Sequence, residues 1–235
     1  MRRILPFFIS IYLSGMAISL AQDSTAVVVD SVKVKDQKYG LRLGVDLAKP
    51  LRTLLDDTYS GFEISGDFRF TDRFYAAVEL GTEKKDRFEA NLNSKTSGSY
   101  FKAGADFNAY NNWVGLRNLI YVGLRYGFSS FNQELLSYGI YTTDQSFSEF
   151  ELREVNQKFD GLTASWAELI VGVKTELLPN LYLGLQLQLK NRISETKPDN
   201  FDNLFIPGFN RTYDESDFGV GYGYSLSYLI PIFKK

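Results

Sequence analysis

The sequence predicts an all-β chain that forms an eight-stranded antiparallel up-and-down β-barrel of the transmembrane, outer-membrane class. Three observations predict it: an export signal, eight segments of alternating apolar and polar residues, and connections that are alternately short and long. We expect three regions: a signal peptide over 1–21, a periplasmic lead-in over 22–38 and the barrel over 39–235.

The first 21 residues are typical of a cleaved signal peptide. Two arginines precede an apolar stretch over 4–20, and Ser19 and Ala21 are the small residues expected before a cleavage site. The alternative is a retained membrane helix, because the stretch approaches spanning length. Pro6 and the polar sequence after residue 21 favour cleavage.

Each barrel strand is predicted from alternation with a period of two residues, apolar toward lipid and polar or small toward the interior. The clearest case is 181–190, where every second residue is leucine. The last segment, 218–232, alternates glycine and serine with larger apolar residues. Six further segments follow the same rule: 39–49, 59–70, 74–82, 99–110, 119–128 and 165–178.

The connections predict the orientation of the barrel. Three short connections alternate with four longer ones: 71–73, 111–118 and 179–180 against 50–58, 83–98, 129–164 and 191–216. Because bacterial barrels have short periplasmic turns and longer extracellular loops, we expect the long connections outside the cell.

The composition excludes most catalytic chemistry. The 235 residues carry a formal net charge of −2 and include neither Cys nor His. Thiol nucleophiles, disulfides, Ser–His–Asp triads and His-ligated metals are therefore excluded. No block of Lys or Arg suits a nucleic acid. We expect no enzyme, no cofactor, no metal site and no nucleic-acid partner.

The register places charged side chains of both signs on the interior face. They are Arg42, Asp46, Glu63, Asp67, Arg69, Glu79, Lys102, Asp106, Arg125, Glu168, Lys174, Glu176 and Lys190. An eight-stranded barrel is only wide enough for its own side chains, so these charges are expected to pair and close the lumen. A narrow ion path or proton relay is the alternative, although selective pores use rings of one sign. Paired carboxylates could also perform acid–base catalysis, but any such barrel holds acidic groups.

Two long connections carry aromatic and apolar residues. The connection 129–164 is expected to be functional or to contain strands extended beyond the membrane, and it holds Tyr138, Tyr141, Phe147, Phe150 and Phe159. The neighbouring loop 197–213 is expected to pack on it as an apolar lid through Phe201, Phe205, Ile206, Pro207 and Phe209. Adhesion or partner binding is the alternative. Acidic stretches at 56–57, 199–203 and 214–217 are interpreted as solvated turns, because none has the spacing of a Ca²⁺ loop.

Several stretches resemble a family of uncharacterised Bacteroidota outer-membrane proteins. They are YGLRLGVDLAKPLRTLLDD, NLIYVGLRYGFSSFNQ, FDGLTASWAEL, PDNFDNLFIPGFNRTYD and the terminal YLIPIFKK. The resemblance covers about residues 38–235. It implies location and fold, but the family has no assigned activity and supplies no catalytic residue.

The leading functional hypothesis is a closed barrel of the outer membrane with a structural, interaction or envelope-maintenance role. Its expected partners are outer-membrane lipids, lipopolysaccharide and an extracellular or envelope protein bound through the long loops, and we expect a monomer. The alternatives are a narrow channel or lateral-entry transporter, a lipid-modifying enzyme of the outer membrane, and a soluble lipocalin-like barrel. The last requires the apolar faces to point inward, which periodicity alone does not decide.

Overall fold

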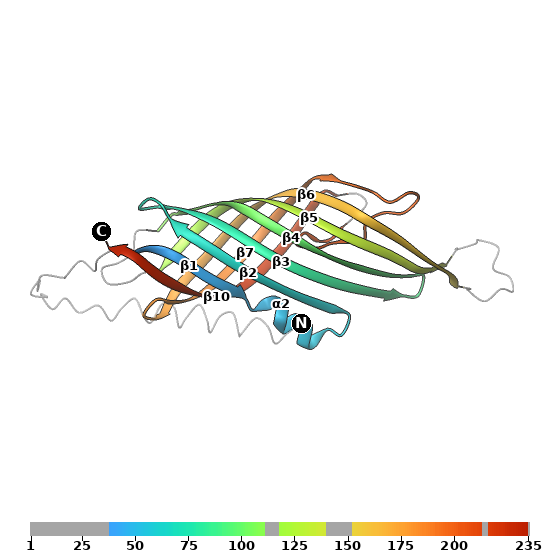
Figure 1. The fold of residues 1–235 in the computed structure, drawn as a ribbon, viewed down its shortest axis with the longest axis horizontal. Helices are drawn as coiled ribbons and strands as arrows, with labels where there is room; N and C mark the ends of the chain where they lie inside the picture. Colours follow the sequence, from blue (N-terminus) through green and yellow to red (C-terminus); the bar gives the residue numbers. More distant parts are fainter. Residues whose placement is uncertain (1–37, 111–117, 140–151, 213–215, 235) are drawn as a thin grey trace, which may run out of the picture. The chain divides into compact units, whose positions relative to one another are not determined.

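Eight antiparallel strands close into one barrel, in the order β1-β10-β7-β6-β5-β4-β3-β2 (Figure 1). The computed structural model describes residues 38–110, 118–139, 152–212 and 216–234. The barrel strands are β1 Lys38–Asp46, β2 Tyr59–Arg69, β3 Phe74–Glu89, β4 Leu92–Asn108, β5 Leu119–Gly139, β6 Leu152–Leu178, β7 Leu181–Glu195 and β10 Phe218–Lys234. The predicted antiparallel up-and-down barrel is therefore confirmed.

The predicted signal peptide and most of the lead-in lie outside the described residues, as do the short connection over 111–117 and Tyr141, Phe147 and Phe150. No helix in the described part of the chain is long and apolar enough to cross a membrane.

Strands continue through two of the predicted long connections, and the prediction of a long loop is wrong for 83–98. β3 and β4 pair from Phe74↔Phe107 to Glu89↔Leu92, so the predicted loop 83–98 is a hairpin with a two-residue turn. β5 and β6 likewise extend into the connection 129–164, which confirms the expectation that it contains extended strands. The halves of these strands that lie farther from the short turns have no continuous apolar face toward the outside of the barrel. The alternation of residues therefore did not reveal them.

The predicted loop 50–58 is also wrong, because it contains the helix α2, Ala48–Leu55. Pro50 lies in the first turn, where its missing N–H is tolerated. The side chains of Leu51, Leu54 and Leu55 are exposed, whereas Lys49 reaches toward the barrel interior. A single helix of eight residues gave too short a pattern to identify.

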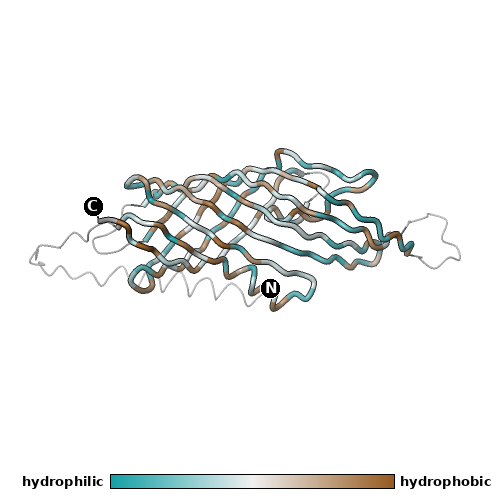
Figure 2. The backbone as a smooth tube through the Cα atoms, in the orientation of Figure 1, coloured by the Kyte–Doolittle hydropathy of each residue, from teal (hydrophilic) through white to brown (hydrophobic). Residues whose placement is uncertain are grey.

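The predicted faces hold along most of the barrel, with charges inside and apolar side chains outside. More large apolar side chains are exposed than buried, and the buried set includes Arg42, Glu79, Lys102 and Glu168. Apolar and polar residues alternate along the strands in Figure 2. This arrangement excludes the lipocalin-like alternative, in which the apolar faces would line the interior.

Tyr39 is an exception to the predicted faces. Its side chain was expected to point outward but is buried, because the register shifts between Tyr39 and Gly40 opposite β10. The hydroxyl of Tyr39 donates to Asp72, and the Arg69 guanidinium lies 4.7 Å from the centre of its ring. The bulge therefore turns an aromatic side chain into the end of the barrel that carries the short turns.

Candidate functional site

The centre of the barrel is organised around Lys102 of β4, whose side chain is 2% exposed. Its Nζ pairs with Glu79 of β3, lies 3.3 Å from Glu63 of β2 and lies 3.8 Å from Glu168 of β6. One cation therefore joins three carboxylates from three other strands. Such a buried group is tolerated only because its charge is matched on several sides.

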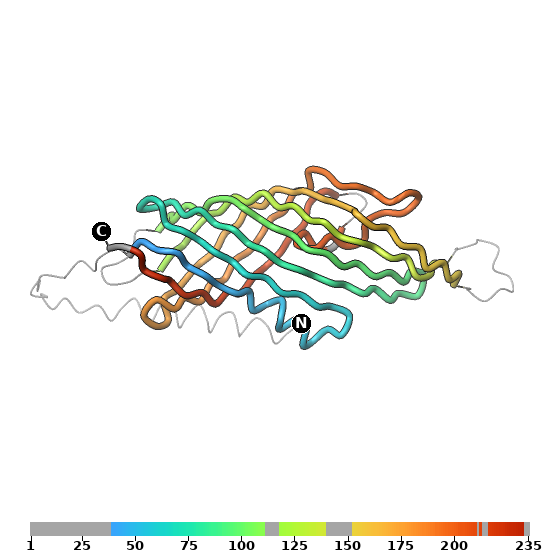
Figure 3. Tube along the Cα trace, viewed as in Figure 1, coloured from blue at the N-terminus to red at the C-terminus, as the bar shows by residue number. Residues whose placement is uncertain are grey.

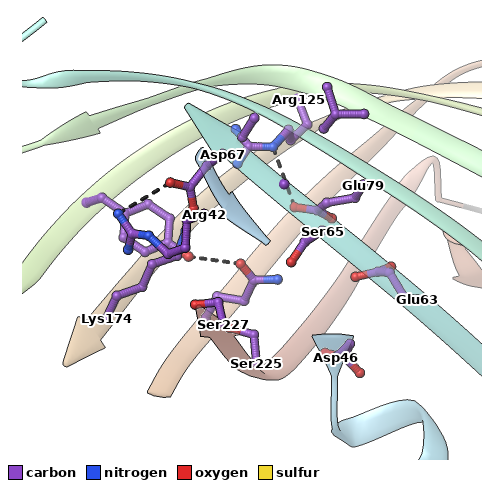
Figure 4. A pocket seen from close by; sticks show the side chains of 15 residues that line it. Arg42, Asp46, Glu63, Ser65, Asp67, Glu79, Arg125, Lys174, Ser225 and Ser227 are labelled. Carbon is purple, nitrogen blue, oxygen red and sulfur yellow. Dashed lines mark hydrogen bonds and ion pairs between the residues drawn. The ribbon is translucent and has the colours of Figure 1, made fainter. Parts of the chain in front are cut away.

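Two further groups of ion pairs fill the half of the barrel nearest the short turns. Arg125 lies 2.8 Å from Asp106 and 3.6 Å from Glu79, so it connects with the central group. Arg42 and Lys174 both pair with Asp67, at 3.3 and 2.7 Å (Figure 4).

Aromatic rings complete this packing. The Arg42 guanidinium lies 4.5 Å from the centre of the Tyr182 ring, a cation–π distance. Tyr121 donates from its hydroxyl to Gln186 at 2.9 Å. These two tyrosines belong to a buried cluster that also contains Tyr75, Leu119, Ile170 and Leu229.

The polar space that remains among these groups has a volume of about 20 Å³, lined by Arg42, Asp67, Glu79 and Arg125 among others. Figure 4 shows their side chains converging on it from opposite walls. This is room for about one water molecule. The space among these ion pairs is therefore filled by their own side chains.

Of the predicted interior charges, Arg69 and Glu176 lie at the end with the short turns. Arg69 donates to the carbonyls of Thr71 and Asp72 in the β2–β3 turn. Glu176 accepts from the backbone N–H of Asn180 at 2.9 Å in the β6–β7 turn. These two residues hold turns and stand apart from the central ion pairs, while Asp46 accepts from the Lys49 N–H at the start of α2.

Sequence reasoning missed two interior charges, Lys49 and Glu83. Lys49 lies on the unpredicted helix α2, and Glu83 lies just beyond the predicted end of its strand. Their side chains pair at 2.5 Å, and Lys49 also lies 3.8 Å from Glu63. Extending the β3 alternation by one more inward position would have found Glu83.

We call the end of the barrel opposite the short turns the outer mouth. Part of the β7–β10 connection fills it. Its small hairpin pairs β8, Phe205–Ile206, with β9, Asn210–Arg211. We call residues 205–210 the lid. Ile206 and Phe209 are almost fully buried against Tyr100, Phe131 and Trp166, with Leu162 and Ala164 in the same cluster. The predicted apolar lid is confirmed, although its main contacts are the barrel walls; of the predicted loop partners, Phe159 stacks on Phe201 at 5.9 Å.

The backbone of Gly208 fixes the lid through hydrogen bonds with two charged side chains. Its N–H donates to Glu83 at 2.7 Å, and its carbonyl accepts from Lys190 at 2.6 Å. Gly208 has φ +82°, and a Cβ there would lie 2.6 Å from the Tyr100 ring. Glycine is therefore required both by the backbone conformation and by the close approach of the ring.

Trp166 connects the lid with the central ion pairs. Its ring packs edge-on against Phe209, with centroids 6.0 Å apart, and its Nε1 donates to Glu168 at 2.7 Å. Glu168 in turn lies 3.6 Å from Lys190. The lid and the charged interior thus form one continuous packed unit.

The chemistry available in this arrangement is limited. The buried carboxylates are engaged with cations, tyrosines or backbone N–H groups, as at Glu63, which accepts from the Tyr100 hydroxyl at 2.5 Å. In the described ranges no group of three or more acidic side chains is placed to hold a metal ion. The arrangement is suited to filling and fixing a barrel.

The fold and interior define a small closed β-barrel with an ion-paired core and a lid. The chain belongs to the family described as Domain of unknown function (DUF6048), whose model matches residues 4–235. No curated protein matches the chain.

Three solved structures are similar to it at 10% identity, and this chain is covered to 83% in each. They are Ail, the attachment invasion locus protein of Yersinia pestis (99% of that chain, TM-score 0.39), Neisserial surface protein A (99%, 0.39) and CarO2 of Acinetobacter baumannii (100%, 0.41). At this level of similarity no property of those proteins is transferred to this chain.

Proposed function

We propose that the protein is a closed outer-membrane barrel with an envelope-maintenance or interaction role, exported by a cleaved signal peptide. The observation that carries the proposal is the apolar outer surface surrounding an ion-paired interior. Monomeric soluble proteins rarely expose contiguous apolar patches beyond a few hundred Å². A bilayer offers this surface the environment that water does not.

Aromatic side chains at the two borders of the apolar surface support membrane placement. Near the short turns, Phe74 lies between Phe70 and Phe107, with ring centroids 6.1 and 5.1 Å away. Toward the outer end, Phe101 contacts Phe128, with centroids 5.8 Å apart. Transmembrane barrels carry such aromatic girdles at both interfaces.

The connections support one orientation of the barrel in the membrane. The short turns at 70–73 and 179–180 lie at one end of the barrel, and α2, the lid and the extended strands lie at the other. We place the short turns in the periplasm and the lid at the cell surface. Lipids and lipopolysaccharide would surround the barrel, and the extended strands β3–β6 would offer a surface to an envelope or extracellular protein.

Membrane placement is tested by heat-modifiable migration on a gel and by extraction. We expect the folded chain to require detergent and to migrate faster than the heat-unfolded chain. Recovery of the folded protein in the soluble periplasmic fraction would contradict the proposal.

The filled centre of the barrel makes ion conduction the less favoured function. A path through the barrel would have to pass Lys102 and the lid, and the space beside the ion pairs holds only about 20 Å³. We expect no single-channel events from folded protein in planar bilayers. Regular single-channel events recorded from folded protein in the absence of denaturant would favour the channel alternative.

We also propose that the protein has no enzymatic activity. The lack of His and Cys and the paired state of the interior carboxylates support this. Incubation of the folded protein with phospholipid and lipid A should leave both unchanged. Lipid cleavage or modification that is lost in Glu168→Gln would overturn it.

A further inference from the structure

One seam of the barrel is incomplete at its outer end. β1 ends at Asp46, opposite Ser225 of β10, and its last described partner on β2 is Ile64. Beyond these pairs, Phe218–Tyr224 of β10 has only β7 as a paired strand in the described chain. Residues 59–63 of β2 likewise pair only with β3. Two open strand edges therefore face the gap left by the short β1.

Helix α2 lies between these two edges, where the chain leaves the wall after β1 and returns as β2 (Figures 1 and 3). The Leu47 N–H donates to the Tyr224 carbonyl at 2.6 Å, which joins the start of the helix to β10. The Thr53 hydroxyl accepts from the Gly61 N–H at 3.0 Å, which joins the helix to β2. A helix cannot continue the strand ladder, so these contacts close the seam only in part.

The seam is unusually apolar on its outside. Leu54, Leu55 and Val220 are 80, 79 and 77% exposed, the highest values among the large apolar side chains of the described chain. Leu54 and Leu55 belong to α2, and Val220 belongs to the open edge of β10. No described part of the protein covers them. In the proposed membrane placement these side chains would lie against acyl chains.

A cleft of about 310 Å³ opens at this seam, within the size range of small-molecule sites. Its outer lining is apolar, formed by Leu187 of β7 with Val220 and Tyr222 of β10. Its inner lining is polar and includes Lys49 with its partner Glu83, and Lys190. The cleft thus reaches from the lipid-facing surface to the charged interior.

Glycine makes this depth possible on β10. Gly221 lines the cleft, and a Cβ there would lie 2.6 Å from the Gln188 Oε1 and 3.2 Å from the Lys190 Nζ. A larger residue at this position would fill the space between the strand and those side chains.

Arg52 of α2 stands at the polar end of the cleft. It also lines a second cavity of about 290 Å³ at the outer mouth, together with Lys85, Arg87, Glu89 and others. Arg52 and Lys85 share one counter-ion, Asp56, at 3.6 and 2.9 Å. Arg87 pairs with Glu89. The Asp56 carboxylate lies closer to Lys85 than to Arg52, and the Arg52 side chain is 39% exposed, so its guanidinium can bind a further oxyanion at the junction of the two cavities.

We propose that the seam between β2 and β10 binds a single-chain membrane amphiphile with an anionic head, a site that rests on the proposed membrane placement. The apolar chain lies along Leu187, Val220 and Tyr222, and the head contacts Arg52. The Arg52 guanidinium and the apolar outer lining of the cleft match the two ends of this ligand. Arg52 is the suitable donor because its guanidinium is always charged and binds oxyanions by two parallel hydrogen bonds.

Native mass spectrometry of the folded chain, released from a neutral tetraoxyethylene detergent, tests this site. The probe is dodecanesulfonate, with methanesulfonate as the head alone and dodecanol as the chain alone. We expect one dodecanesulfonate per chain and at least about tenfold weaker binding of either half, as loss of a charged hydrogen bond or of the apolar contact requires.

Two variants locate the probe. Arg52→Gln should weaken dodecanesulfonate binding about tenfold because it removes the charged donor. Gly221→Val should weaken it by filling the cleft. The matched controls are Lys84→Gln, an exposed cation of β3 that lines neither cavity, and Gly66→Val, where an added Cβ lies 3.6 Å from its nearest neighbour. Both controls should bind as the unchanged protein does.

Several outcomes would overturn the site. Equal dodecanesulfonate binding by Arg52→Gln and the unchanged protein would contradict the contact between the head and Arg52. Equal binding of dodecanol and dodecanesulfonate would show that the seam binds only the apolar chain. A dimer whose formation displaces the probe would show that a second copy covers the seam. Heat-modifiable migration is recorded for every variant, so a failure of membrane folding is distinguished from a failure of binding.

Discussion

In the middle of the barrel, ion pairs between strands fill the interior, whereas at the outer mouth a hairpin of one connection fills it with apolar side chains. Lys102 contacts carboxylates on β2, β3 and β6, so the middle is held by strands far apart in the chain. The lid is one short segment packed on Tyr100, Phe131 and Trp166. The middle therefore depends on the whole barrel being formed, whereas opening of the lid breaks only the contacts of one short segment.

The largest effect is expected at Lys102. Lys102→Met leaves Glu63, Glu79 and Glu168 buried without their shared cation, and removing one partner of a buried pair costs about 3–5 kcal/mol. Urea unfolding followed by gel migration measures the loss in the free energy of unfolding. Lys84→Met, at a side chain that is 56% exposed, is the control and should change it by less than about 0.5 kcal/mol. Similar values for both variants would show that the central ion pairs do not hold the barrel.

The lid should respond locally to loss of its buried ring. Phe209→Ala removes a side chain from the Trp166 cluster, at a cost of about 3 kcal/mol for closing the lid. Because the chain has no cysteine, labelling of Ile206→Cys reports lid opening, and its rate should rise about a hundredfold. Phe88→Ala, at an exposed ring on β3, is the control. An equal loss of global stability would mean that the lid and the middle unfold together.

Two glycines separate backbone strain from packing at the mouth. Gly208 and Gly161 have φ +82° and +70°, but only Gly208 has a neighbour, the Tyr100 ring, within 4 Å of an added Cβ. Gly161→Ala should cost about 1 kcal/mol from backbone strain, and Gly208→Ala should cost at least 1 kcal/mol more because of the clash. The rate of labelling of Ile206→Cys measures the effect of Gly208→Ala on lid opening. Equal effects would show that the ring moves aside.

The sequence predicted the fold well where the outward face must be apolar. The alternating leucines of 181–190 fall within β7, and Asn180 takes the positive φ, 69°, that suits the predicted tight turn. In the strand halves farther from the short turns, the outward face can also be polar. The pairing of β3 with β4 from Glu83↔Gly98 to Glu89↔Leu92 therefore left no apolar alternation in the sequence.

The hydrogen bonds that hold the lid could not be predicted from the sequence, for a different reason. Glu83 and Lys190 meet the Gly208 peptide only because a connection of the chain folds back into the barrel. Its apolar residues indicated burial, but nothing in their spacing indicates which wall they contact. Register predicts which residues face inward, and only the three-dimensional path of the loop shows which of them meet.

The smallest effect is expected at the edge of the mouth, where Asp56 holds α2 to β3. Hydrogen bonds from Thr58 and Lys85 lower the pKa of the Asp56 carboxyl well below its usual range. A group with a lowered folded pKa stabilises above its unfolded pKa, about 3.9, and this stabilisation is lost as the pH falls below that value. Because the side chain is about one-third exposed, solvent screening limits the contribution to less than about 1 kcal/mol.

Asp56→Asn should therefore reduce the free energy of unfolding by a small, constant amount between about pH 5 and 8, and the difference should close below about pH 4. Urea unfolding across this pH range measures it, with the exposed neighbour in Asp57→Asn as the matched control. A difference that grows as the pH falls would have the wrong sign for a carboxylate stabilised by its neighbours. A pH-independent loss as large as that expected for Lys102→Met would show that the mouth depends on buried charge in the same way as the middle, which would remove the contrast between the two regions.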